Sequence, residues 1–197
     1  TPEELLEEAA EWRNLECLER VRNFKVDPVV QQLLEEKTLQ DVRNGWAKEV
    51  PVPAPGSRQV LTPRFANDEG YKRKQAPDGS FYEYRKVRAC DDYRFSRVNA
   101  ATTIQEETPM EHLDVLLWFL CVLYQAGHTN LLVLAEDFVA AYNSLPLAVS
   151  EMPFCVVTLM MQGVLKCYQA LRCQFGSTSS VHSWHRVGWN AQRILAY

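Results

Sequence analysis

The sequence lacks the motifs that mark several common enzyme and membrane classes. It contains no P-loop, no Gly-rich dinucleotide turn and no Ser nucleophile elbow, which argues against the enzymes that depend on those motifs. Its apolar runs at 113–124 and 154–165 are too short to cross a bilayer, and no secretory signal is recognisable. Carboxylates are scarce after Asp137, where the sequence contains only Glu151.

Cysteines with metal-binding or redox spacing are also missing. The sequence has six cysteines but no Cys-x-x-Cys pair, and most of the six lie inside apolar runs. Such cysteines are typical of reduced core residues. We therefore expect an intracellular, reducing compartment, with the nucleus and organelles included.

Composition and charge are those of an ordinary globular protein. Of 197 residues, 47% are hydrophobic and 23% are charged, with a formal net charge of -4. This balance argues against a generic nucleic-acid coat, which needs clustered cations. The charge is uneven, however, because residues 58–97 contain 10 basic residues against 6 acids. That basic stretch is either a phosphate-binding surface or a solvated hairpin face.

Three helices are expected in residues 1–50. The first, "TPEELLEEAAEWRNLECLERVRNF", has a Thr cap, Pro at the first helical position and apolar residues at 5, 9, 12, 15, 18 and 21, which predicts one amphipathic helix. A second helix is expected from Asp27 and Pro28, and a third from Thr38 through "LQDVRNGW". Residues 51–57, "PVPAPGS", are predicted to be a stiff linker.

Residues 58–197 show patterns typical of both strands and helices, so we expect an α+β fold. Residues 58–107 contain "RQVLTPRFA" and "SFYEYRKVRAC" around the turn "APDGS", which predicts a hairpin. Residues 108–197 begin with a helix that Gly127 ends. The strands "NLLVLAEDF", "PFCVVTLM" and "VLKCYQALRC" are expected next, followed by a final helix over residues 177–197.

Three ordered blocks carry a resemblance to a known family. The blocks are "KVRACDDYRFSRVNAATT", "LAEDFVAAYNSLPL" and "LRCQFGSTSSVHSWHRV". In sequence and spacing they resemble consecutive blocks of the reverse transcriptases of retroelements, over about residues 58–196. The resemblance implies a small fingers-like β region at 58–107 and an incomplete palm at 108–197, with an antiparallel sheet backed by helices.

The resemblance also implies roles for individual residues. Asp137 would help to bind two divalent metals, Mg²⁺ in an active enzyme, whereas the structural alternative is an acid at a strand end. Tyr142 would screen the sugar 2′ position, and Lys86 and Arg88 would hold the triphosphate. The candidate nucleotide-binding residues are therefore Lys86, Arg88, Tyr142, Phe175 and Gly176.

The chain departs from the family in its carboxylates. A two-metal centre needs bridging carboxylates from separate strands, but no second acidic palm block follows the Phe-Gly-Ser block. We therefore expect a retroelement-derived, catalytically inactive fragment that serves as a structural or interaction subunit and needs no cofactor by itself. The alternative is the fingers and palm portion of an active RNA-directed DNA polymerase, completed by a missing segment.

Protein subunits of a larger complex are the expected partners, with weak RNA or DNA binding at most. Without the second acidic block, the 130–137 strand would lack a neighbour, and an open apolar edge invites association. The final helix would also present apolar side chains that one small sheet cannot cover. The predicted interface residues are Leu132, Leu134, Trp184, Trp189 and Ile194. The other large aromatic residues are expected to be core rather than base-stacking: Trp12, Trp46, Trp118 and Tyr124.

Overall fold

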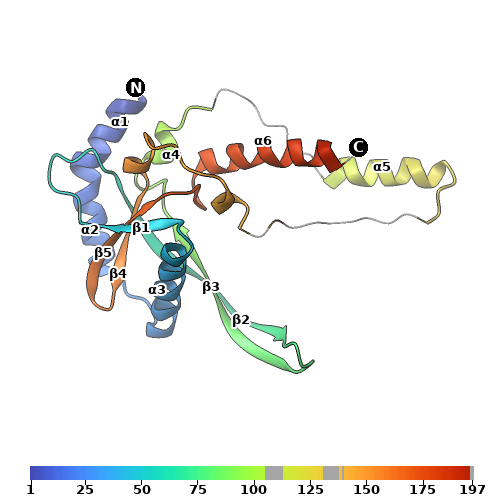
Figure 1. The fold of residues 1–197 in the computed structure, drawn as a ribbon, viewed down its shortest axis with the longest axis horizontal. Coiled ribbons are helices and arrows are strands. Elements are labelled where there is room, and N and C mark those ends of the chain that lie inside the picture. Colours follow the sequence, from blue (N-terminus) through green and yellow to red (C-terminus); the bar gives the residue numbers. More distant parts are fainter. Residues whose placement is uncertain (105–112, 131–137, 139, 196–197) are drawn as a thin grey trace.

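The computed structural model describes residues 1–104, 113–130, 138 and 140–195 (Figure 1). A five-stranded mixed sheet, in the order β1-β5-β4-β2-β3, is combined with helices. The strands are β1 (Ala47–Val50), β2 (Leu61–Gln75), β3 (Phe81–Asp91), β4 (Val156–Met161) and β5 (Val164–Ala170). The predicted α+β class, with N-terminal helices and a sheet backed by helices, is confirmed. The sheet is mixed because β2 and β4 pair in parallel, whereas β4 and β5, the described strands of the region expected to be palm, pair antiparallel.

The helices lie before, between and after the strands. The longer ones are α1 (Pro2–Glu8), α2 (Asn14–Asn23), α3 (Pro28–Arg43), α5 (Leu113–Gln125) and α6 (Thr178–Leu195). The short ones are α4 (Val98–Ala101) and the 3₁₀ helices η2 (Tyr142–Ser144) and η3 (Met152–Phe154). No described helix is long and apolar enough to cross a membrane.

The first helix contains a π turn that changes its buried face. A π-helix, η1 (Ala9–Arg13), joins α1 to α2. In a regular α-helix, Ala9 and Cys17 would point about 80° apart, since each residue advances by about 100°. The extra residue of a π turn removes roughly 100° of that rotation and leaves the two residues on nearly one face. Both are buried.

The same turn overturns part of the predicted apolar stripe. Trp12 and Leu15 were expected on the core face, but their exposed fractions are 64% and 60%. Ala9, Cys17 and Val21 take the buried positions instead. The periodicity therefore predicted the helix correctly and its inner face only in part.

Residues 28–43 form one helix, so the prediction of two separate helices there is wrong. Asp27 caps α3 by accepting from the backbone N–H groups of Val29 (2.9 Å) and Val30 (3.2 Å). Thr38 is not a cap: it is buried in mid-helix and donates to the carbonyl of Leu34 at 2.9 Å. The expected helix through 46 is also wrong, because the helix ends at Arg43 and the chain turns into β1, which pairs with β5.

The hairpin predicted within residues 58–107 is confirmed, and β4 and β5 form a second hairpin. β2 and β3 pair antiparallel, and Ala76 donates to the carbonyl of Ser80 at 2.8 Å across their turn. β4 and β5 are joined by Gln162 and Gly163, whose φ values are 50° and 78°. Positive φ at both central residues is the type I′ geometry that matches strand twist. The third predicted strand, 130–138, lies mostly outside the described residues.

The Pro-rich linker connects two strands of the same sheet. β1 precedes it and β2 follows it, and both belong to the five-stranded sheet. The division at 51–57 and the boundaries at 50, 58 and 108 therefore stay predictions.

Helices cover both faces of the sheet. Leu34 of α3 packs with Val157 and Leu159, on one face. Cys17 of α2 packs with Val156 on the other, since alternate residues of β4 point to opposite faces. β4 is the middle strand of the sheet and is buried on both faces, and each of its fully buried aliphatic side chains contributes about 1.5–3 kcal/mol.

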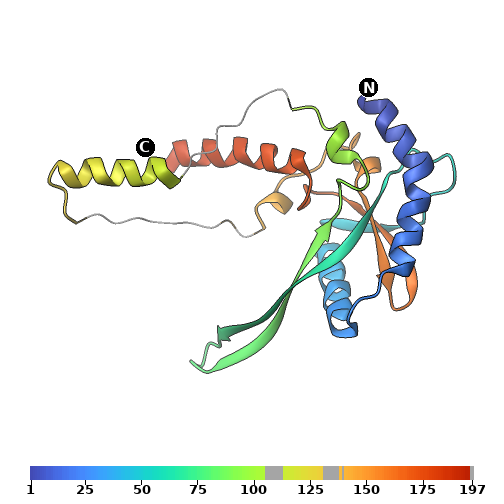
Figure 2. The ribbon, with the colours of Figure 1, turned by 180° about the vertical axis from the view of Figure 1, so that it is seen from behind.

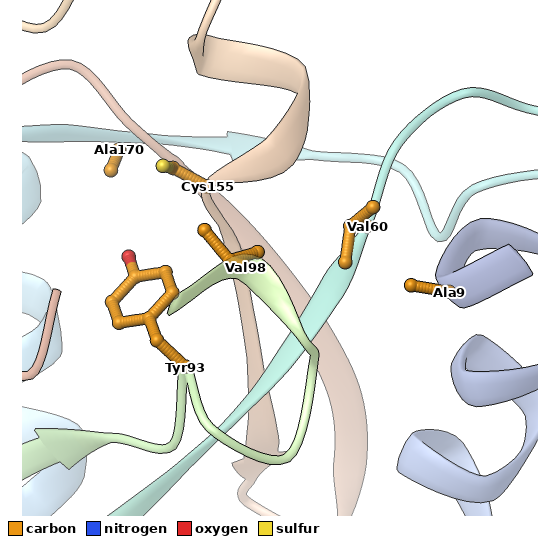
Figure 3. Close-up of a cluster of buried hydrophobic side chains, with 6 residues drawn as sticks. All are labelled: Ala9, Val60, Tyr93, Val98, Cys155 and Ala170. Carbon is orange, nitrogen blue, oxygen red and sulfur yellow. The ribbon is translucent and has the colours of Figure 1, made fainter. Parts of the chain in front are cut away.

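A third cluster ties the π turn to the segment after β3 (Figure 3). It contains Ala9, Val60, Tyr93, Val98, Cys155 and Ala170. Tyr93 is fully buried, and its hydroxyl, which points toward Cys155 and Ala170 (Figure 3), has no hydrogen-bond partner among the described residues. This cluster fixes the start of the loop that follows β3.

Two parts project from this body. The distal halves of β2 and β3 form a two-stranded ribbon that extends away from the helices (Figures 1 and 2). α5 lies on the far side of α6 from the sheet (Figure 1). Both parts expose large apolar side chains.

Candidate nucleotide and nucleic-acid interface

The first and third sequence blocks are locked together at Gly176. The φ of this glycine is 92°, and a Cβ built there would lie 2.5 Å from the carbonyl oxygen of Asp91. Asn99 bridges the same contact: its amide donates to the carbonyl of Gly176 at 2.9 Å and its oxygen accepts from the N–H of Thr178 at 2.9 Å. Only glycine fits position 176 without strain.

The described part of the second block joins them. The rings of Tyr142 and Phe175 meet edge to face, with centroids 4.8 Å apart and an interplanar angle of 78°. Nearby, the side chain of Asn143 donates to the carbonyl of Cys173 at 3.4 Å, and the N–H of Cys173 donates to the carbonyl of Leu145 at 3.0 Å. The three blocks therefore converge at one place, although Tyr142 lies 51 positions after Asp91 and 33 positions before Phe175 in the sequence.

Asp137, the predicted metal ligand, lies outside the described residues, as do Leu132 and Leu134. Its neighbour Phe138 is described, and its ring meets that of Trp184 at 5.1 Å. Among the described residues, no group of three or more His, Cys, Asp or Glu side chains is arranged to hold a metal ion.

A buried ion network holds the base of the ribbon against α3. The guanidinium of Arg64 donates to both carboxylate oxygens of Asp91, at 2.7 and 3.0 Å, and to Asp41 at 2.9 Å. Thr38 and Gln174 accept from the same group, at 3.3 and 3.4 Å. Burial opposes the charge of Arg64, but Asp91 and Asp41 raise its pKa, so the guanidinium stays charged.

This network corrects one sequence interpretation. Arg64 was counted with the cations that could follow a phosphate backbone, but its side chain is buried and its donors are taken. It positions the ribbon rather than a ligand. Sequence alone gave no sign of this, because the partners Thr38, Asp41 and Gln174 are remote in the chain.

Lys86 and Arg88 lie on the exposed ribbon, next to each other on one face. Both pair with Glu69, Lys86 at 2.8 Å and Arg88 in a shorter contact. These cations lower the pKa of Glu69, chiefly through the hydrogen bond from Lys86. One carboxylate therefore holds the two cations that the resemblance assigns to a triphosphate.

The strand register adds four residues to that face. Lys72 lies opposite Tyr84 and Lys74 opposite Tyr82, and cross-strand partners share a face. Because side chains alternate along a strand, Tyr82, Tyr84, Lys86 and Arg88 point the same way. We name this surface the ribbon face: Lys72, Lys74, Tyr82, Tyr84, Lys86 and Arg88, with Glu69 beside them.

The ribbon face combines positive charge with stacking surface. The ring centroids of Tyr82 and Tyr84 are 6.2 Å apart, and both side chains are exposed. Cations along a strand that also carries exposed aromatic rings are the combination found in single-stranded nucleic-acid sites. Tyr82 and Tyr84 were not among the binding residues predicted from the sequence. The alternation in "FYEYRKVR", which places them on the same strand face as Lys86 and Arg88, could have indicated them.

The cations on the opposite side of the ribbon make contacts within the protein. The guanidinium of Arg73 lies 4.3 Å from the centre of the Phe81 ring. Arg85 pairs with Asp68 at 2.7 Å and with Asp27, the cap of α3, at 3.2 Å. The cations of residues 72–88 are thus divided between two faces. Arg73 and Arg85 contact other parts of the protein, and the remaining cations lie on the ribbon face.

The predicted interface residues on α6 are described only in part. Trp184 is half-buried against Phe138, and Trp189 is exposed with its ring near that of His185, at 5.8 Å. The side chain of Ile194 lies outside the described residues. The expectation that the other large aromatic residues are core is wrong for Trp12, Trp118 and Tyr124, which are exposed.

All six cysteines are free, and four of them are buried: Cys17, Cys155, Cys167 and Cys173. Burial raises the pKa of Cys17 and of Cys155 to about 12. These thiols therefore stay protonated and belong to the core, as their apolar sequence context predicts.

No protein-family model matches the chain, and no curated protein matches it.

Proposed function

We propose that residues 58–197 form the fingers and a partial palm of a reverse-transcriptase-like protein, and that the chain acts as a binding and interaction unit rather than as a complete polymerase. One observation carries the proposal: the three blocks that carry the resemblance meet through Gly176, Asn99 and the Tyr142–Phe175 pair. Their contact supports the proposal because residues that form one nucleotide site must lie together in the fold.

The binding role rests on the ribbon face. Lys86 and Arg88 share one face with Lys72, Lys74 and two exposed tyrosines. In this proposal the cations contact phosphates and the tyrosines stack on bases of a single strand. The single carboxylate Glu69 limits the affinity, because a phosphate must compete with it for Lys86 and Arg88.

The non-catalytic role rests on the carboxylates. Two-metal catalysis needs several acids around the metals. In the sequence, Asp137 is followed only by Glu151, and Asp91 is committed to Arg64. Asp137 is the metal ligand that the resemblance assigns, and we expect no cofactor to be needed for the binding role of the chain.

An interaction role is supported by the exposed apolar side chains of α5. Leu117, Trp118 and Phe119 are at least half exposed, and a helix that is apolar on all sides is normally buried. Protein subunits of a larger assembly are the proposed partners of this region.

The alternative is an active RNA-directed DNA polymerase that a further segment completes with acids. It is supported by the contact of Tyr142 with Phe175, since the resemblance assigns both residues to nucleotide binding. Primer extension distinguishes the two. The chain alone should not extend a primer on an RNA template with Mg²⁺ or Mn²⁺, and Asp137→Asn should leave that result unchanged.

Binding is measured on the same preparation. Lys86→Ala with Arg88→Ala should weaken single-stranded RNA binding and reduce the salt dependence by roughly one to two counterions. Template-dependent incorporation by the wild-type chain, lost in Asp137→Asn, would contradict the non-catalytic role and establish the polymerase.

A further inference from the structure

The N-terminal helix presents an apolar pair to solvent. Trp12 and Leu15, at i and i+3, are 64% and 60% exposed. The two residues are three positions apart in one continuous helical segment, and both side chains face solvent. This patch is remote in the fold from the ribbon face, and the inference drawn from it does not depend on the proposed function.

Packing of the buried face explains the π turn, but it does not explain why position 12, which is exposed, is a tryptophan. The turn brings Ala9 and Cys17 onto one buried face, which any residue at position 12 would allow. Trp12 stands inside the turn, where the wider path directs it to solvent. π turns are frequent at functional sites, and residues that break the local rules of a fold tend to serve function.

Unpaired acids surround the patch. Glu8 is four residues before Trp12, Glu11 is four before Leu15, and Glu19 is four after it. Two other exposed acids of this helix are neutralised: Glu7 pairs with Arg58 at 3.7 Å and Glu16 with Arg13 at 2.5 Å.

By contrast, Glu8, Glu11 and Glu19 have no ion pair among the described residues, and all three are exposed. Three exposed acids without an ion pair therefore lie within four residues of the apolar pair, which makes the surface around it predominantly acidic. Nucleic acid and anionic lipid surfaces are repelled by such a surface.

We propose that this patch, defined as Trp12 and Leu15 with Glu8, Glu11 and Glu19, docks a basic segment of another protein. Trp12 enters an apolar groove of the partner, and the glutamates pair with Lys or Arg side chains around it. A tryptophan anchor with a polar rim is the usual anatomy of an interface hot spot. The charge complementarity makes a basic amphipathic helix the fitting occupant.

A second copy of the chain is the competing occupant, because its own ribbon face is basic. The ribbon face carries four cations against the single acid Glu69. Self-association through Trp12 would therefore assign the patch to a dimer and overturn the proposal.

The test uses the full chain and two labelled helical peptides, one of lysine and leucine and one of glutamate and leucine. Binding is followed by fluorescence anisotropy at two salt concentrations. The wild-type chain should bind the lysine peptide and not the glutamate peptide. Trp12→Ala should weaken binding by about tenfold or more, and Glu8→Gln with Glu11→Gln and Glu19→Gln should weaken it and remove most of its salt dependence.

Val149→Ala is the matched control, because Val149 is an exposed apolar residue in the loop before η3. It should bind like the wild type. Trp12 is exposed, so Trp12→Ala should unfold at the wild-type temperature, which separates lost binding from lost folding. Equal affinity of Trp12→Ala and wild type, absence of binding to the lysine peptide, or dimerisation that Trp12→Ala abolishes would each overturn the proposal.

Discussion

The backbone at Gly176 passes so close to Asp91 that a methyl group on residue 176 would lie 2.5 Å from the Asp91 carbonyl oxygen. The loop before α6 and the end of β3 are therefore in direct backbone contact. Gly176→Ala should destabilise the protein through both the clash and the positive φ, by about 2–4 kcal/mol. Urea unfolding measures this change.

Gly163→Ala is the control for that experiment. Gly163 also has a positive φ, 78°, but a Cβ there meets nothing within 4 Å. Gly163→Ala should lower the free energy of unfolding only by the backbone strain, about 1 kcal/mol. Equal destabilisation by the two substitutions would mean that the contact between Gly176 and Asp91 is looser than described.

The buried charge of Arg64 gives a second prediction. Arg64→Met leaves Asp91 without its partner in a buried site, which typically costs about 3–5 kcal/mol. Arg64→Met combined with Asp91→Asn should recover part of that loss, because the buried negative charge is removed as well. A double variant as unstable as the sum of the two singles would show that the pair is not coupled.

Acid should weaken the attachment of the ribbon. Hydrogen bonds from Arg85 lower the pKa of Asp68, and the backbone N–H groups of Val30 and Val29 lower that of Asp27. A lowered folded pKa stabilises the fold above the unfolded value, and this stability is lost as pH falls through the folded value. Stability should therefore decrease below about pH 4, and less steeply in Asp68→Asn. An unchanged slope in that variant would exclude Asp68 as a contributor.

Thiol labelling tests the burial of the cysteines. The pKa values of Cys17 and Cys155 are raised to about 12 by burial, so both should resist iodoacetamide at neutral pH. Cys121 on α5 is exposed and should react first. Mass spectrometry of digested protein locates the labels. Rapid labelling of Cys17 in the folded chain would show that α2 leaves the sheet.

The exposed side chains of α5 predict the behaviour of the isolated chain. Leu117 and Trp118 face solvent, so the chain should self-associate when it is expressed without a partner. Leu117→Lys with Trp118→Lys should reduce the apparent mass in light scattering, whereas Val149→Lys, also at an exposed apolar position, should not. A monodisperse wild-type monomer would remove the argument for a partner at α5.

Local signals in the sequence predicted most of the elements that the structure describes. The Thr cap and the "APDGS" turn each act within a few residues, and each element that they predict is present. The failures have longer range. Thr38 has the sequence pattern of a cap, but the burial of its hydroxyl between Leu34 and Arg64 keeps it in mid-helix.

The candidate site shows the same limit. The resemblance identified Lys86, Arg88, Tyr142, Phe175 and Gly176 one block at a time. It could not indicate that Arg64 is neutralised by Asp91, because that pair depends on the register of β2 and β3. The exposure of Trp12 was equally hidden, since it depends on one π turn. Contacts between remote segments decide which cations and aromatic residues remain available.

The most direct test of the account compares two neighbouring cations on opposite faces of the ribbon. Lys74 lies on the ribbon face opposite Tyr82, and Arg73 lies on the other side against Phe81. Single-stranded RNA binding is measured by anisotropy over a range of salt concentrations for the wild type, Lys74→Ala and Arg73→Ala. If the ribbon face binds RNA, Lys74→Ala lowers the salt slope by about one counterion and Arg73→Ala leaves it unchanged. Equal effects of the two substitutions, or no RNA binding by the wild type, would contradict the account.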